Sequence, residues 1–399
     1  MQICNLIANL HLCSMFISRQ IADTILQHSQ WYPILYLGGP RQSGKTTLLK
    51  RLFPDLQYVS LEDPDTHLLA TDDPRRFLHS FQGGAILDEA QRVPDLFSYL
   101  QTRVDADKSQ RFVLSGSQNF LLMEKISQSL AGRVGILNLF PLSFQEIQST
   151  GVAVELDILA WRGGYPALYD STVPQDVFFN NYLQTYLERD VRTLKNVGDL
   201  SQFNRFIRLC AGRVGQPLNM SNLATDAGVA VNTVKAWISV LEASYMIYLL
   251  PPYHNNFNKR LTKSPKMYFF DTGLVCHLLG ISASRQLETH HYYSNIIENY
   301  LIAELFKKRI NLGKRPAFWF WQDQKKNEID LLIEEGGKIK AIEIKSSQTY
   351  NTRLISGLGA WQKISGSTPE NQYLVYAGQQ SMELELGRLL PWQKAINTL

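Results

Sequence analysis

Short apolar segments alternate with amphipathic stretches along the first 140 residues. The amphipathic stretches have the spacing of helices, and the order of the two kinds of segment is typical of a parallel sheet covered by helices. The apolar segments that we expect to form buried strands are residues 34–37, 58–61, 85–87, 112–114 and 134–139. The pattern therefore predicts an α/β domain of five strands.

The rest of the chain changes its pattern twice. Residues 143–194 are helical in pattern, and residues 202–250 read as three short helices followed by an apolar strand. From about residue 295 a helix, a β-hairpin and a further α/β region follow. These changes predict domain boundaries near residues 142, 198 and 290.

A glycine-rich loop follows the first predicted strand and precedes a helix. Its sequence GPRQSGKT matches the phosphate-binding pattern GxxxxGK[ST]. The glycines let successive N–H groups point at phosphate oxygens, and the helix N-terminus adds its positive end. Lys45 would neutralise the β- and γ-phosphates of ATP, and the Thr46 hydroxyl would bind Mg²⁺. The residues expected to surround the nucleotide are Gly39, Pro40, Arg41, Gln42, Ser43, Gly44, Lys45, Thr46 and Thr47.

Two acids end the third predicted strand, in the sequence GGAILDEAQ. Downstream of a phosphate loop, Asp88 is expected to hold Mg²⁺ through water. Glu89 is expected to act as the base that polarises an attacking water. Because a phosphate acceptor other than water would need its own base, this pair favours ATP hydrolysis over phosphate transfer.

Polar residues near the last two predicted strands are further candidates. Ser115 ends the fourth strand and is expected to orient the water or sense the γ-phosphate, with Ser117 as the alternative and a plain turn as another. Arg133 precedes the fifth strand and is a candidate arginine finger toward a neighbouring subunit. An ordinary surface arginine explains Arg133 as well.

The middle of the chain has the order of elements found in a winged helix. Three short helices, with a Gly turn before the third, are typical of a helix-turn-helix. Asn232, Thr233 and Lys235 would face a DNA major groove. The strand at 247–250, a basic loop and a second strand at 267–270 suggest a wing. Its expected phosphate contacts are Lys259, Arg260, Lys263 and Lys266. The alternative is a spacer between proteins.

A second set of acids lies on a hairpin whose turn is expected at Gly336–Gly337. If the turn is centred there, Asp330 on one strand directly faces Glu343 on the other. The alternation of side chains puts Lys345 on the same face and isoleucine and leucine on the opposite face. The hairpin therefore predicts one apolar face and one face with two acids and a lysine.

Two opposed carboxylates repel each other, so a cation is expected to bridge them. Mg²⁺ fits an oxygen-only site, and Lys345 would position or activate a water at a phosphodiester. Glu298, on an amphipathic helix upstream, would add a third acid. The alternatives are a degenerate fold without activity and a surface hairpin in which Lys345 forms a salt bridge.

These motifs resemble those of known families. The segments GGPRQSGKTTLLK, AILDEAQ, VLSGS, SLAGR and FPLSFQE resemble the AAA+ ATPases, in a bacterial and archaeal branch whose ATPase domain is joined to a C-terminal domain of unknown function. The resemblance covers roughly residues 18–350 and implies a five-stranded sheet with a helical lid and frequent oligomeric assembly. The acids and the Glu-x-Lys pattern resemble the PD-(D/E)xK nuclease superfamily, although Ile329 stands where Pro is common.

Composition limits the remaining choices only mildly. The formal net charge of +4 permits a nucleic-acid partner without requiring one. The four cysteines form no CxxC pair, which favours a reducing, cytoplasmic location. No uninterrupted apolar run reaches the length of a membrane span. Residues 1–14 lack the basic start of a secretory signal and are expected to be an upstream extension.

We therefore expect an α/β P-loop NTPase sheet with a helical lid, a winged-helix domain and a restriction-endonuclease-like α/β domain. The expected function is ATP binding and hydrolysis by a protein that acts on DNA or binds it. The expected partners are ATP, DNA and further copies of the chain in a homo-oligomer. The alternatives are a Mg²⁺-dependent nuclease gated by ATP and a nucleotide-switched binding module with an inactive nuclease-like fold. The expected segments are an extension (1–17), the ATPase core (18–142), the lid (143–198), the winged helix (199–290) and the nuclease-like domain (291–399).

Overall fold

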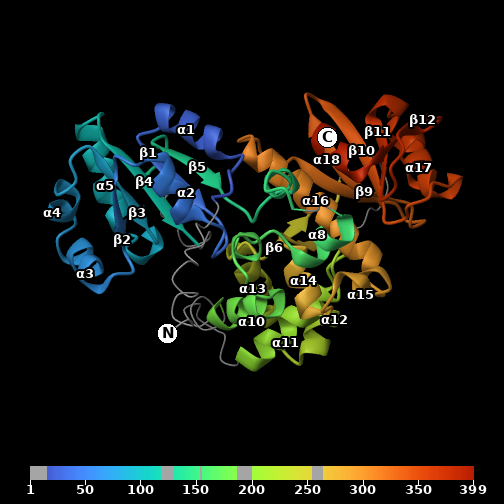
Figure 1. The fold of residues 1–399 in the computed structure, drawn as a ribbon, viewed down its shortest axis with the longest axis horizontal. Helices are drawn as coiled ribbons and strands as arrows, with labels where there is room; N and C mark the ends of the chain where they lie inside the picture. Colours follow the sequence, from blue (N-terminus) through green and yellow to red (C-terminus); the bar gives the residue numbers. More distant parts are fainter. Residues whose placement is uncertain (1–15, 118–128, 153–154, 187–199, 254–263) are drawn as a thin grey trace, which may run out of the picture.

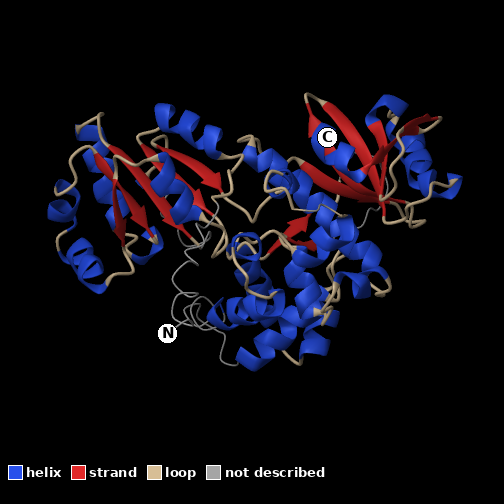
Figure 2. Cartoon of the chain, viewed as in Figure 1, coloured by secondary structure: helices blue, strands red, loops and turns tan. Residues whose placement is uncertain are grey.

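The computed structural model describes residues 16–117, 129–152, 155–186, 200–253 and 264–399. In Figure 1 the chain runs from a blue sheet-containing unit through green and yellow helices to an orange and red sheet. Figure 2 shows strands gathered at the two ends of the molecule and a mostly helical region between and below them. The expected extension, residues 1–17, lies outside the described residues except for its last two positions.

The first sheet is parallel, as the sequence predicts, with the strand order β2-β3-β4-β1-β5. Alternate residues of β1 enter two different hydrophobic clusters, so both faces of this sheet are covered. This double burial explains why its strands read as continuous apolar runs. The strands are β1 (Ile34–Gly38), β2 (Gln57–Ser60), β3 (Gly84–Asp88), β4 (Arg111–Gly116) and β5 (Val134–Asn138).

Helices pack on both faces of this sheet. One face is covered by α1 and α2, whose isoleucines and leucines share a cluster with Leu35 and Leu37. The other face is covered by α4 and α5, whose apolar residues pack around Ile34 and Tyr36. The helices of this unit are α1 (Ala22–Trp31), α2 (Lys45–Leu52), α3 (Pro64–Asp72), α4 (Pro74–His79), the 3-10 helix η1 (Ala90–Arg92) and α5 (Leu96–Ala106).

The described middle of the chain is mostly helical and carries one antiparallel strand pair, β6 with β7. Three helices and this strand pair lie at the positions expected for the winged helix. Part of the expected lid and the loop between the two strands lie outside the described residues. The elements are α7 (Phe144–Gln148), α8 (Leu156–Arg162), α9 (Ala167–Asp170), α10 (Gln175–Tyr186), α11 (Leu200–Ala211), α12 (Met220–Ala227), α13 (Val231–Ala243), β6 (Ile247–Leu250), β7 (Lys266–Phe269), α14 (Thr272–Leu278) and α15 (Ser284–Glu288).

The second sheet has the strand order β12-β13-β11-β10-β9-β8. Its central hairpin turns at Gly336–Gly337, and both glycines have a positive φ, as a tight turn of this kind requires. The elements are α16 (Tyr293–Asn311), β8 (Phe318–Gln322), β9 (Glu328–Glu335), β10 (Lys338–Lys345), η3 (Thr352–Ile355), α17 (Ser356–Ser365), η4 (Pro369–Asn371), β11 (Gln372–Tyr376), β12 (Met382–Leu384), β13 (Gly387–Pro391) and α18 (Trp392–Thr398).

One hydrophobic cluster joins the middle helices to the second sheet, with members from Phe140 to Leu399. Helix α16 also reaches the first unit, because the Asn311 carbonyl accepts a hydrogen bond from the Thr24 hydroxyl of α1 (2.7 Å). Lys307 of α16 donates another to the Leu142 carbonyl (3.0 Å), a few residues beyond β5. The middle and C-terminal parts thus share a core, and α16 connects that core to the first sheet.

Candidate functional site

The glycine-rich loop curls between β1 and α2. Lys45, the first residue of α2, donates from Nζ to the carbonyls of Gly39 (2.9 Å) and Pro40 (2.8 Å). A lysine that reaches the carbonyls five and six residues before it holds the loop folded back on itself. Gly44 has φ +92° and Gln42 has φ +59°, so the loop uses left-handed backbone to make this turn. The loop therefore curls back beside the start of α2, which is the backbone arrangement expected of a phosphate site.

Thr46 and Asp88 face each other at the same edge of the sheet. The Thr46 hydroxyl donates to Oδ2 of Asp88 over 2.8 Å, and the Tyr58 hydroxyl donates to the same oxygen over 2.8 Å. Ser115 donates to the other oxygen, Oδ1. Asp88 is buried. A hydroxyl and a carboxylate held together beside a phosphate loop are oxygen ligands that suit Mg²⁺.

Glu89 follows Asp88 at a strained position, with φ +55°. Burial raises the pKa of its carboxyl, and the positive charges of Lys45 and Arg41 only partly oppose that rise. Its Oε2 accepts hydrogen bonds from the Gln91 amide and from the Ser117 hydroxyl, the latter over 3.5 Å. A desolvated carboxylate close to the phosphate lysine is suited to polarise a water.

The two serine candidates thus contact different acids. Ser115 is bound to Asp88 and so positions the metal-side carboxylate, whereas Ser117, the alternative, reaches Glu89. Which of the two serines orients the water or senses the γ-phosphate stays a prediction, with Ser115 as the first candidate and Ser117 as the alternative. The sequence could not separate the two, because both follow the same apolar strand.

Arg133 lies at the other edge of the sheet from the phosphate loop. The backbone carbonyl of Arg133 accepts from Ile34, at the amino end of β1, whereas the loop follows its carboxyl end. The guanidinium forms a two-fold contact with Asp105, from Nε to Oδ1 and from Nη2 to Oδ2, each 2.8 Å. The structure does not bring Arg133 together with Lys45 of the same chain. Arg133 could therefore act as an arginine finger only on the nucleotide of another copy of the chain.

A cavity of about 160 Å³ opens beside the phosphate loop. Arg19 fixes its wall, because Nη1 donates to the Ser43 carbonyl (2.7 Å) and Nη2 to the Phe140 carbonyl (2.6 Å). Ser43, Gly44 and Thr47 are among the predicted loop residues, whereas Arg19 and Phe140 were missed because they lie far from the loop along the chain. The cavity is lined by Phe16, Ile17, Arg19, Gly44, Thr47, Leu48, Leu142, Pro166 and Asp170.

The second acid set lies on β9 and β10 in the predicted register. Ile342 pairs with Leu331, so Asp330 and Glu343 are the next opposed residues. Lys345 Nζ lies 2.7 Å from Glu343 Oε1 and 3.7 Å from Asp330 Oδ2. Burial, reinforced by Asp330, raises the pKa of Glu343 to about 8. Oε2 of Glu343 is buried and has no hydrogen-bond partner among the described residues. This orphaned oxygen is the feature of the hairpin that best fits a metal ligand.

Lys266 enters this acidic region from β7. It is 2% exposed, and its Nζ contacts Glu328 and lies 3.3 Å from Glu298 Oε1. The Tyr268 hydroxyl also binds Glu298, whose pKa burial raises to about 7. The prediction that Lys266 contacts DNA phosphates from a wing is therefore wrong, because it is a buried counter-ion.

Glu298, Asp330 and Glu343 do not form one metal site. In the described part of the chain, no group of three or more His, Cys, Asp or Glu side chains is arranged to hold a metal ion. The structure does not bring Glu298 into such a group, and Lys266 and Tyr268 both contact Oε1 of its carboxylate. The other expected wing contacts, Lys259, Arg260 and Lys263, lie outside the described residues.

The candidate recognition helix is α13. Its residues Asn232 and Lys235 are exposed and Thr233 is half-buried. Trp237 and Ile238 on the next turn are buried in the shared core. The helix therefore has one free polar side, which is compatible with a groove or with a partner protein.

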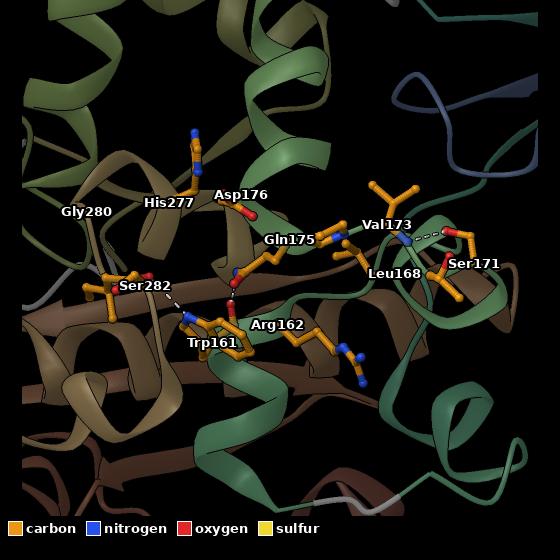
Figure 3. A pocket seen from close by; sticks show the side chains of 13 residues that line it. Trp161, Arg162, Leu168, Ser171, Val173, Gln175, Asp176, His277, Gly280 and Ser282 are labelled. Carbon is orange, nitrogen blue, oxygen red and sulfur yellow. Dashed lines mark hydrogen bonds between the residues drawn. The ribbon is translucent and has the colours of Figure 1, made fainter.

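A further cavity of about 690 Å³ lies among α8, α9, α10 and α14. Figure 3 shows Gln175 beside Trp161 in this cavity. The Gln175 amide donates to the Trp161 carbonyl over 2.5 Å, and the Trp161 indole donates to the Ile281 carbonyl over 3.1 Å. The lining of this cavity includes none of the predicted site residues.

None of the described helices combines the length and apolar character that a bilayer crossing requires.

Comparisons with known proteins match three parts of the chain. Residues 32–148 match the AAA domain, and residues 153–285 and 293–395 match two domains of unknown function, DUF8612 and DUF4143. The phosphate loop and both of its acids therefore lie within an AAA-type ATPase domain, and neither later match assigns a winged helix or a nuclease.

Relatives that match most of the chain are also found. The chain is 31% identical over 343 residues to an uncharacterized protein of Mycobacterium tuberculosis, covering 84% of this chain and 76% of that one. It is 24% identical over 355 residues to an uncharacterized protein of Haemophilus influenzae, covering 80% and 84%. Among solved structures, a Walker-type ATPase of Pyrococcus abyssi is similar at a TM-score of 0.45 and 16% identity, covering 66% of this chain and 96% of that one.

Proposed function

The chain belongs to the family of the uncharacterized mycobacterial protein and carries an AAA domain, and we propose that it hydrolyses ATP at the phosphate loop with Mg²⁺. The observation that carries the proposal is the Thr46–Asp88 contact of 2.8 Å beside the curled loop, with Glu89 next to it. A hydroxyl, a carboxylate and a partly desolvated base around one phosphate site are the parts that hydrolysis needs.

Each residue has one task in this proposal. Lys45 exchanges its two carbonyl partners for β- and γ-phosphate oxygens and neutralises their charge. Thr46 and Asp88 would hold Mg²⁺, which supplies charge neutralisation when it is bound. Glu89 accepts the proton from the attacking water, and Ser117 and Gln91 hold its carboxylate in place.

The cavity beside the loop would receive the base of the nucleotide. It adjoins Gly44 and Thr47, so a ligand whose phosphates lie on the loop can extend into it. Phe16, Ile17 and Pro166 offer apolar faces, and apolar faces are suited to pack against a flat aromatic ring. Phe16 precedes the matched AAA domain and Pro166 follows it, so the base would contact segments on both sides of that domain.

The direct test is phosphate release from ATP by the wild type and by Glu89→Gln. The variant keeps the size of the side chain and removes the base, so we expect it to bind a fluorescent ATP analogue as the wild type does. Its turnover should fall by at least about 100-fold. Full turnover in Glu89→Gln, or no turnover by the wild type at any protein concentration, would contradict the proposal. Testing several protein concentrations covers the case in which Arg133 of another copy is needed.

A second candidate function is Mg²⁺-dependent cleavage of DNA at the hairpin. The orphaned Oε2 of Glu343, opposite Asp330 and beside Lys345, supports it, because a cation would satisfy this oxygen. Exposed Asn232 and Lys235 on α13 support DNA as the partner. Lys266 and the absence of a third carboxylate ligand in the described residues weigh against it.

Cleavage is tested on duplex and single-stranded DNA with Mg²⁺ or Mn²⁺. The wild type should nick the DNA, Glu343→Gln should not, and Glu383→Gln, which changes an exposed acid on β12, should match the wild type. Cleavage that survives Glu343→Gln rules out this site. No cleavage by the wild type on any of these substrates leaves ATP hydrolysis as the function and the hairpin as a structural element.

A further inference from the structure

The turn that follows helix α13 contacts the residues directly before the phosphate loop. Tyr245 lies two residues beyond α13, and its hydroxyl donates to Oδ1 of Asn138 at the end of β5 over 2.9 Å. A Cβ on Gly38 would collide with this hydroxyl. Gly38 is the last residue of β1, directly before Gly39 of the loop. A side chain from the middle of the chain is thus fixed against the residue from which the phosphate loop starts.

Tyr36 connects this contact to the catalytic acids. It lies on β1, is completely buried, and forms a hydrogen bond with the Tyr245 hydroxyl. The nearby negative charge of Glu89 contributes to raising the pKa of Tyr36, after burial and Tyr245. Glu89 is bound by Gln91, and a Cβ on Gly116 would lie 2.5 Å from Gln91 Oε1 and 3.3 Å from the Tyr36 hydroxyl. Polar groups therefore run from Glu89 to Tyr245.

The backbone of Tyr245 is held in an unfavourable conformation. Its φ is +57°, in the left-handed region that costs any residue with a Cβ. The turn is closed by hydrogen bonds from Tyr245 N–H to the Glu242 carbonyl and from Met246 N–H to the Leu241 carbonyl. A glycine would fit this turn with less strain. A tyrosine there must be held by its side-chain contacts, which are those with Tyr36, Asn138 and the ring of Phe140.

We propose that the Tyr36–Tyr245 hydroxyl pair couples the nucleotide site to helix α13. A phosphate on the loop and a change at Glu89 would shift Tyr36 and the Gly38 backbone, and Tyr245 would pass that shift to the strained turn after α13. The coupling works in both directions, so a partner bound to the exposed side of α13 changes ATP binding or turnover by the same route. This inference rests on the proposed ATP site and adds a positioning residue outside the AAA domain.

The experiment compares Tyr245→Phe with Tyr248→Phe, a matched control. Tyr248 lies three residues further along, in β6, and its buried hydroxyl has no hydrogen-bond partner among the described residues. Amide hydrogen exchange of α13 is measured with and without a slowly hydrolysed ATP analogue and Mg²⁺, and kcat and KM for ATP are measured in parallel. A merely structural role would change exchange equally in both nucleotide states.

We expect nucleotide to slow exchange in α13 of the wild type and of Tyr248→Phe, and to leave it unchanged in Tyr245→Phe. Turnover by Tyr245→Phe should fall by about fivefold or more, within the usual range of coupling between sites. The double variant Tyr36→Phe/Tyr245→Phe should be no slower than the single one. A wild-type response in Tyr245→Phe, or no response in a wild type that binds ATP, overturns the coupling. Failure of the wild type to bind the analogue overturns the proposed ATP site itself.

Discussion

The Thr46 hydroxyl and the Asp88 carboxylate are in direct contact, 2.8 Å apart, although 42 positions separate them in the chain. The contact forms at the carboxyl edge of the first sheet, where α2 begins and β3 ends. Tyr58 and Ser115 fix Asp88 from two further strands. The oxygens that would hold the metal are therefore positioned before any nucleotide arrives, so binding requires little rearrangement of the protein.

Replacing Asp88 by Asn should abolish most Mg²⁺-dependent turnover. The amide keeps the shape of the side chain and loses its charge, so the metal is held less tightly. We expect phosphate release to fall by at least about 100-fold. Tyr58→Phe removes only one of the hydrogen bonds to Asp88 and should have a much smaller effect. Turnover is measured across a Mg²⁺ titration, and an Asp88→Asn curve identical to that of the wild type would exclude Asp88 as a metal-side residue.

Replacing Lys266 by Met should destabilise the protein strongly. The change leaves the carboxylates of Glu298 and Glu328 without their shared cation in a buried place. Breaking a buried ion pair in this way costs about 3–5 kcal/mol. Lys340→Met is the control, since its pair with Glu335 is partly exposed and should contribute about 0–1 kcal/mol. Urea unfolding gives both values, and equal losses in the two variants would show that Lys266 is not a buried counter-ion.

Glu335 should make stability depend on pH in the acid range. Its hydrogen bond with Lys340 and the charge of Arg309 lower its pKa to about 2. A carboxyl with a lowered pKa stabilises the fold above its unfolded pKa, and the stabilisation is lost as the pH falls toward 2. Glu335→Gln should therefore have a lower melting temperature than the wild type at pH 7, and the difference should shrink between about pH 4.5 and pH 2. A difference that stays constant over this range would contradict the assignment.

The sequence predicts those parts of the molecule that depend on neighbouring residues. The phosphate loop and the turn at Gly336–Gly337 are recognisable because glycine spacing fixes the backbone locally. The register that opposes Asp330 and Glu343 then follows from the alternation of side chains. The strands of the first sheet are visible because burial on both faces makes them continuously apolar.

Contacts between distant segments could not be predicted in the same way. Lys266 follows a basic stretch of sequence and therefore resembles a solvent-exposed residue. In the folded chain it is buried and forms ion pairs with acids on α16 and β9. Arg133 is paired by Asp105 from a neighbouring helix. Tyr245 lies between the predicted third helix and the predicted strand at 247–250, and only the folded chain shows its hydroxyl beside Asn138 and Gly38. These contacts join residues far apart in the chain, so no local sequence pattern predicts them.

The most direct test of the account is Mg²⁺-dependent phosphate release from ATP by the wild type and by Lys45→Ala. Lys45 donates hydrogen bonds to two carbonyls of the phosphate loop in the free protein and would donate to phosphate oxygens in the ATP complex. The account predicts measurable release by the wild type, none without Mg²⁺, and a loss of at least about 100-fold in Lys45→Ala. Equal release by the two proteins would show that the curled loop is not where ATP is hydrolysed.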